Sequence, residues 1–124
     1  NVHRLFVRED LRKQTPALVG SLYNAVTALS VELTGRVYAG GVLKIEPGEA
    51  ARLRVPHPAL LRTVPVEAMD FALRADDELK VFSLADGFIA QTTELEPETL
   101  MKVRRAYAAV RESRLSSTTV RASS

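Results

Sequence analysis

The sequence predicts an α+β fold, with a few short strands packed on a long central helix, followed by a helical C-terminal half. Apolar residues recur at helical spacing across residues 16–34, 66–83 and 97–115. Short runs rich in β-branched residues and bounded by glycine or proline occur in the first half. The 124 residues, 46% of them hydrophobic and 26% charged, suit one domain with its own core.

The first predicted strand is VHRLFV, residues 2–7, where β-branched and aromatic residues alternate loosely with polar ones. The charged run that follows is a predicted turn. Thr15 then suits an N-cap, and Pro16 suits the first helical position because no hydrogen-bond donor is needed there. This helix is expected to end at Thr34, with Gly35 as a left-handed cap. Its apolar stripe is Leu18, Leu22, Val26, Leu29 and Leu33.

The predicted helix has no charged residue from Gln14 to Val31, although a surface helix normally has a charged face. Outside the leucine stripe it carries small polar residues, among them Ser21, Asn24 and Thr27. Such a face suits close packing, so one interpretation is an interaction face for a partner subunit or for a second copy in a homodimer. The alternative is that the later helices of the chain itself cover it.

A second strand is predicted over residues 42–46, followed by at most one helical turn. Prolines then restrict residues 57–65, which are predicted to be a connector between an α/β half (1–56) and a helical half (66–115). The tail, residues 116–124, has few apolar residues and is expected to fray.

The helical half is expected to contain a helix over 66–83, a turn at Asp86-Gly87, and a last helix from Pro97 to about Leu115. The residues expected to face inward in the first helix are Met69, Leu73, Leu79 and Phe82. In the last helix they are Leu100, Val103, Tyr107 and Val110, with Arg104, Arg105, Arg111 and Arg114 largely outside this stripe.

Composition excludes several classes of site. The chain has no cysteine, which excludes disulfides and thiolate metal sites, and its two histidines lie far apart in the sequence. No run of 18 apolar residues is present, so no membrane span is predicted and a cytoplasmic protein is the simplest interpretation. The acidic run Asp76-Asp77-Glu78 is better explained as a solvated face than as a metal site, because consecutive helical residues point in different directions. No catalytic or metal-ligating residue is predicted.

The net charge of +2 is unevenly distributed. Residues 1–62 carry nine Lys/Arg against five Asp/Glu, residues 63–98 carry two against nine, and residues 99–124 carry six against one. Such segregation can make basic surfaces at both ends of the chain and an acidic surface in the middle. The alternative is that the acidic middle folds against the basic ends.

The segment GRVYAGGVLK, residues 35–44, is the best candidate for a binding site. Glycine lets a backbone N–H approach a phosphate, arginine binds phosphate or a guanine edge through two hydrogen bonds, and tyrosine can stack on a base. The alternative is turn chemistry alone, with a helix cap at Gly35 and a bulge or hairpin at Gly40-Gly41.

This segment and the residues on either side of it resemble a known family. A helix with Tyr23, Asn24 and Thr27, then GRVYAGGVL (35–43), EPGEA (46–50) and Val55-Pro56 resemble the C-terminal region of adenine-N6 DNA methyltransferases of bacterial restriction–modification systems. The opening Asn1-Val2-His3-Arg4 and the arginine-rich close, residues 111–114, are also similar. Ala39 departs from the pattern, which usually has glycine there.

The resemblance implies a non-catalytic DNA target-recognition domain, in restriction–modification or phage defence. Its implied partners are double-stranded DNA and a catalytic methyltransferase domain in cis or in trans. S-adenosylmethionine is implied for the parent enzyme only, because the chain lacks a glycine-rich cofactor loop and the Asn/Asp-Pro-Pro-Tyr/Phe motif that holds a flipped adenine. The implied DNA-binding residues are Arg4, Arg36, Tyr38, Gly40, Gly41 and Lys44. The competing interpretation is a structural domain that docks a catalytic or partner subunit through the uncharged helix face.

Overall fold

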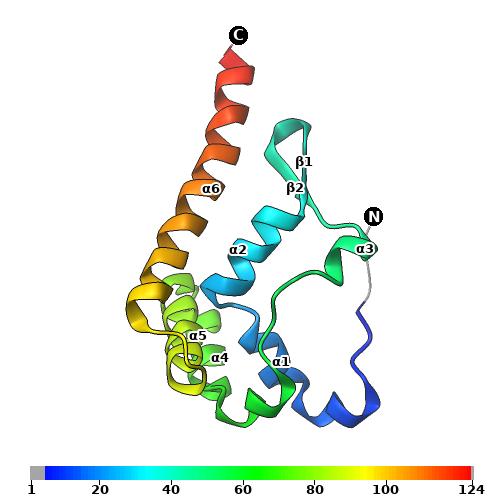
Figure 1. Ribbon diagram of the computed structural model, residues 1–124, viewed down its shortest axis with the longest axis vertical. Helices are drawn as coiled ribbons and strands as arrows, with labels where there is room; N and C mark the ends of the chain where they lie inside the picture. The colour runs from blue at the N-terminus through cyan, green and yellow to red at the C-terminus, as the bar shows by residue number, and fades with distance from the viewer. Residues whose placement is uncertain (1–4, 124) are drawn as a thin grey trace. The chain divides into compact units, whose positions relative to one another are not determined.

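The computed structural model describes residues 5–123, with side chains described for residues 5–116. The α+β class is confirmed, since the described chain is mostly helical and contains a two-stranded antiparallel sheet (Figure 1). Contacts divide the chain into two compact units, each built from two separate stretches. The first unit comprises residues 1–24 and 55–97, and the second comprises residues 25–54 and 98–124. The unit boundaries fall between Asn24 and Ala25, between Arg54 and Val55, and between Pro97 and Glu98.

The first unit is helical. It contains the 3-10 helices η1 (Glu9–Gln14) and η3 (Pro58–Thr63) and the α-helices α1 (Thr15–Ser21), α4 (Val66–Arg74) and α5 (Glu78–Thr92). Its buried apolar core is Ala17, Leu61, Val64, Met69, Ala72, Val81, Ala85, Phe88 and Ile89. Leu61 and Val64 come from the proline-rich segment, so this segment is part of the core as well as a connection.

The N-terminal strand prediction is wrong for the described residues of that run. Leu5 and Phe6 are 84% and 87% exposed and lie in irregular chain, because no second strand is present there to pair with them. The following charged run forms η1, which leads directly into α1. Pro16 stands at the start of α1 as predicted, but Thr15 is not the N-cap, since its hydroxyl donates to a carbonyl of η1.

The long helix predicted over residues 16–34 is two helices, α1 and α2 (Ala25–Thr34), separated at Leu22–Asn24. Ser21 Oγ donates to the Leu18 carbonyl at 2.7 Å, and Asn24 Nδ2 donates to the Ser21 carbonyl at 2.6 Å. Serine and asparagine side chains that bond to nearby backbone groups compete with helical hydrogen bonds. The leucine spacing predicted the helices correctly but could not detect this interruption.

The helix predicted over residues 66–83 is likewise two helices, α4 and α5. The break contains Asp76, whose φ of 58° lies in the left-handed region that aspartate tolerates better than most residues. Asp77 caps α5 by accepting a hydrogen bond from the Lys80 N–H at 3.1 Å. The turn predicted at Asp86-Gly87 is wrong, because both residues lie inside α5. Of the residues expected to face inward, Met69 is buried and Phe82 half-buried, whereas Leu73 and Leu79 are exposed.

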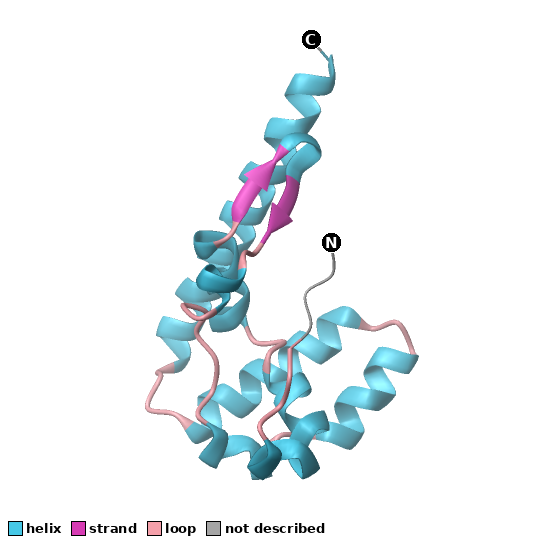
Figure 2. Cartoon of the chain, turned by 90° about the vertical axis from the view of Figure 1, so that its right-hand side faces the viewer, coloured by secondary structure: helices cyan, strands magenta, loops and turns pink. Residues whose placement is uncertain are grey.

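The second unit contains α2, β1 (Arg36–Tyr38), η2 (Ala39–Gly41), β2 (Val42–Lys44), α3 (Pro47–Ala50) and α6 (Pro97–Ser123) from Glu98 onward. The two strands form a hairpin, which Figure 2 shows in magenta. The second predicted strand is thus confirmed, although it is shorter than expected. The last helix continues past its predicted end at Leu115 to Ser123. No helix in the described residues is long and apolar enough to cross a membrane.

Gly35 follows α2, but it is not the left-handed cap that was predicted. Positive φ values occur at Gly40 and Gly41 among the described glycines. The Gly35 N–H donates to the Val31 carbonyl at 2.9 Å, as in a continuing helix. A Cβ on Gly35 would lie 2.8 Å from a methyl carbon of Leu43 and 2.8 Å from one of Ile45. The glycine is therefore needed for close packing where the hairpin leaves α2.

Gly35→Ala is expected to lower the free energy of unfolding by about 1 kcal/mol, because the new methyl group overpacks the base of the hairpin. Gly48→Ala is the matched control, since a Cβ there would meet no atom within 4 Å. Urea denaturation of both variants measures the difference. Equal stabilities of the two variants would contradict the packing role of Gly35.

Candidate nucleic-acid interface

The hairpin places three of the predicted contact residues, Arg36, Tyr38 and Lys44, on one face. Arg36 pairs with Lys44, and Tyr38 pairs with Val42, in the antiparallel register. Alternate strand residues share a face, so Arg36, Tyr38 and Lys44 lie on the same side of the ribbon. The Arg36 side chain is 65% exposed and Tyr38 is 47% exposed. Lys44 Nζ lies 5.7 Å from the centroid of the Tyr38 ring, within the range of a cation–π contact.

Gly40 and Gly41 form the turn of this hairpin. Their φ values of 83° and 73° are ones that residues with a side chain rarely adopt. Turn chemistry is therefore sufficient to explain both glycines. Gly40 is exposed, and a Cβ there would meet no atom within 4 Å, whereas Gly41 is buried. A role of the turn in binding thus stays a prediction.

Each cation of the hairpin has a carboxylate partner. Arg36 Nε donates to Glu49 Oε1 at 2.5 Å, and Lys44 Nζ lies 3.1 Å from Glu46 Oε1. These hydrogen bonds raise the pKa of Arg36 and of Lys44. Both side chains are therefore positively charged at neutral pH and remain accessible to solvent.

Glu49 joins the hairpin to α3. Besides binding Arg36, its carboxylate accepts a hydrogen bond from the Glu46 N–H at 3.0 Å, which forms a capping box at the start of α3. The Glu46 N–H first, and Arg36 second, lower the pKa of Glu49 below its ordinary value. Glu49 therefore stabilises the fold at neutral pH, and this contribution is lost as the pH falls through its lowered folded-state pKa. The sequence contained this residue in its EPGEA motif but did not show its partner.

Arg114 is a functional candidate that sequence reasoning missed. It was expected outside the buried stripe of the last helix, yet its side chain is only 15% exposed. Its Nε and Nη2 donate to the two carboxylate oxygens of Glu32 at 2.9 and 2.7 Å, and its Nη1 donates to the Gly41 carbonyl at 2.6 Å. Glu32 raises the pKa of Arg114. The sequence hints at this ion pair only through Glu32, which is the first charged residue after the uncharged run.

The predicted interaction face is buried. Ser21, Asn24 and Thr27 are 0%, 1% and 5% exposed. Thr27 Oγ1 donates to the Arg54 carbonyl at 2.6 Å, while Leu33 of the predicted apolar stripe is 68% exposed. The alternative interpretation, that the chain itself covers these small polar residues, accounts for their burial. The remaining predicted site residue, Arg4, lies outside the described residues.

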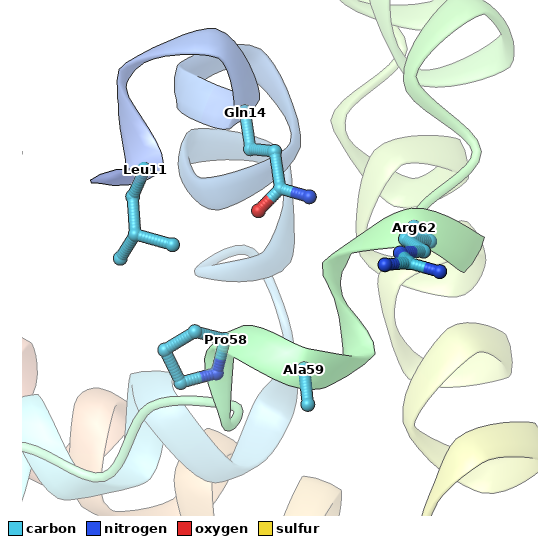
Figure 3. A pocket seen from close by; sticks show the side chains of 5 residues that line it. All are labelled: Leu11, Gln14, Pro58, Ala59 and Arg62. Atoms are coloured by element: carbon cyan, nitrogen blue, oxygen red, sulfur yellow. The ribbon is translucent and has the colours of Figure 1, made fainter. Parts of the chain in front are cut away.

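A pocket of about 480 Å³ lies in the first unit between η1 and η3 (Figure 3). Its lining residues are Leu11, Gln14, Pro58, Ala59 and Arg62. Arg62 is the one ionisable residue among them, so the lining offers no acid–base pair and no nucleophile with a base. In the described part of the chain, no cluster of three or more His, Cys, Asp or Glu residues is suited to a metal ion. The pocket therefore receives no catalytic assignment.

Comparison with known proteins identifies the class to which this fold and hairpin belong. That class is the C-terminal domains of restriction–modification methyltransferases. Specifically, residues 1–90 match the family described as the C-terminal domain of the Type II methyltransferase M.Eco57I, and the chain belongs to this family. No curated protein and no solved structure matches it. The matched stretch contains the whole hairpin and ends within α5, before α6.

Proposed function

We propose that this domain binds double-stranded DNA and contributes to target recognition by an S-adenosylmethionine-dependent adenine-N6 DNA methyltransferase. The observation that carries the proposal is the position of Arg36 directly opposite Lys44 on an exposed ribbon. Like charges directly opposite each other destabilise a sheet. Both side chains also stay accessible to solvent beside their carboxylate partners. A phosphate backbone compensates both charges, and a two-stranded ribbon fits the major groove of B-DNA.

The proposed contacts follow from the geometry of the hairpin face. Arg36 has five N–H donors, of which one binds Glu49, so the others are available for a phosphate or a base edge. Lys44 binds a phosphate as a point charge, and Tyr38 between them packs on a sugar or a base. Gly40 lets the turn approach the DNA backbone because it has no Cβ.

The charge of the second unit supports a polyanionic ligand. This unit, which contains the hairpin, carries ten Lys/Arg against five Asp/Glu. The first unit carries seven against ten. The excess of basic residues is therefore found in the unit that presents the proposed DNA-binding face.

S-adenosylmethionine and the catalytic domain are proposed for the parent enzyme, in cis or in trans. Two features of the described residues support the proposal that the cofactor is bound outside this domain. The glycine turn joins two strands, whereas nucleotide-type cofactors are held where a glycine-rich turn joins a strand to a helix. The pocket between η1 and η3 also has no carboxylate for a ribose. The proposed part of this domain is to hold and orient the DNA, in the cytoplasm.

The test is a fluorescence-anisotropy titration of a labelled DNA duplex with this chain at increasing salt. Two phosphate contacts predict that the logarithm of the binding constant falls with the logarithm of salt concentration with a slope of about −2 or steeper. Absence of binding at low salt, or a slope near zero, would contradict the proposal.

Glu49→Gln is expected to strengthen DNA binding at low salt by about threefold, since the change removes a negative charge next to Arg36. The matched control is Asp70→Asn, which removes the carboxylate partner of exposed Arg74 in the first unit. The same anisotropy titration compares the two variants. An equal gain for both would indicate a general effect of net charge and count against the assigned face.

A further inference from the structure

The turn of the hairpin is held by a side chain from a distant part of the sequence. The guanidinium of Arg114, in α6, contacts Glu32 of α2 and Gly41 of the turn, which are 82 and 73 positions away. One planar group thus binds two elements of the same unit, using a separate nitrogen for each of three acceptors. Figure 1 shows α6 running beside α2 and the hairpin.

Both acceptors of the Arg114 side chain are held in place. The Glu32 side chain is only 5% exposed, and it accepts a bidentate hydrogen bond whose geometry a guanidinium can satisfy and an ammonium cannot. Gly41 is buried, and its left-handed backbone sets the direction of the carbonyl that Arg114 binds. At the other end of the hairpin, the methyl groups of Leu43 and Ile45 cover Gly35. The hairpin is therefore held at its base by packing around Gly35 and at its turn by the hydrogen bond from Arg114 to Gly41.

We propose that Arg114 is a positioning residue that holds the hairpin turn against α2, so that the C-terminal helix determines how the face of Arg36, Tyr38 and Lys44 is presented. Arg114 itself contacts no DNA in this proposal, because its side chain is only 15% exposed and each of its three nitrogens already donates within the chain. The identity of the ligand rests on the proposed function, whereas the positioning of the hairpin does not. The helix α6 is thereby part of the binding unit, although the family match ends at residue 90.

The first test is hydrogen exchange of the hairpin amides in the full chain without DNA. Arg114→Met is expected to speed exchange of the β1–β2 amides by about tenfold or more, because a hydrogen bond from a charged group to the turn is lost. Amides of α4 and α5 are expected to keep their exchange rates. Arg111→Met, which removes an exposed arginine of the same helix, is the matched control and is expected to leave the hairpin unchanged.

The double variant Glu32→Gln/Arg114→Met covers the case in which Arg114→Met does not fold, because it leaves no unpaired buried carboxylate. It is also expected to speed exchange in the hairpin by about tenfold. Unchanged hairpin exchange in a folded variant would overturn the proposal, and so would equal acceleration in all helices.

The second test is the salt dependence of DNA binding. A positioning residue predicts that Arg114→Met weakens binding while the slope against salt stays that of the unmodified chain, since no phosphate contact is lost. A slope smaller by about one would show that Arg114 is itself a phosphate contact and would overturn the positioning role. If the unmodified chain binds no DNA, the proposed function fails, and hydrogen exchange alone decides whether Arg114 positions the hairpin.

Discussion

Arg114→Met is expected to lower the free energy of unfolding of the chain by about 2 kcal/mol. Methionine keeps much of the aliphatic packing of arginine but removes all three donating nitrogens. The Glu32 carboxylate, 5% exposed, then loses both hydrogen bonds from the guanidinium, and the buried Gly41 carbonyl loses its bond to Arg114. Removing one partner of such a pair costs more than removing both, because a charge is left without compensation.

Urea denaturation measures this effect together with two controls. The double variant Glu32→Gln/Arg114→Met is expected to recover part of the lost stability, since the uncompensated charge is gone. Arg111→Met is expected to change stability by less than about 0.5 kcal/mol, as is usual at exposed positions. A similar loss in Arg111→Met would show that any arginine of α6 has this effect and would contradict the specific role of Arg114.

Arg36→Ala is expected to weaken DNA binding by about tenfold and to reduce the salt slope by about one. The matched control is Arg74→Ala in the first unit. Arg74 is also exposed, its Nε binds the Asp70 carboxylate at 2.9 Å, and that bond raises its pKa as Glu49 raises that of Arg36. Both substitutions therefore remove one exposed guanidinium that is paired with a carboxylate. Equal effects on affinity would show that DNA binds through net charge and not through the hairpin.

The sequence predicted the elements more reliably than their interruptions. Helical spacing of apolar residues located α1, α2, α4, the first part of α5, and α6. It missed the break at Leu22–Asn24 because that break depends on two side-chain hydrogen bonds, and it misplaced the later break because Asp76 adopts a left-handed conformation inside an otherwise helical pattern. Asp86-Gly87 has the composition of a turn but lies within α5, where tertiary packing overrides local preference.

The candidate site was predictable only where its residues are close in sequence. The segment GRVYAGGVLK contains both strands and the turn, so its spacing was sufficient to predict a hairpin as one of the two alternatives. Glu49 lies thirteen positions from Arg36, and Glu32 lies 82 positions from Arg114. Pairings of this kind depend on how distant elements pack, which no local pattern encodes. The same limit applies to Ser21, Asn24 and Thr27, whose burial depends on residues far along the chain.

An NMR titration of the labelled chain with a DNA duplex tests most directly whether the hairpin is the binding surface. Amide shifts that change on addition of DNA are expected to concentrate in Arg36–Lys44 and to disappear at high salt. Saturable binding in which the amide shifts change in α4 and α5 but not in the hairpin would contradict the assignment of the hairpin as the DNA-binding surface.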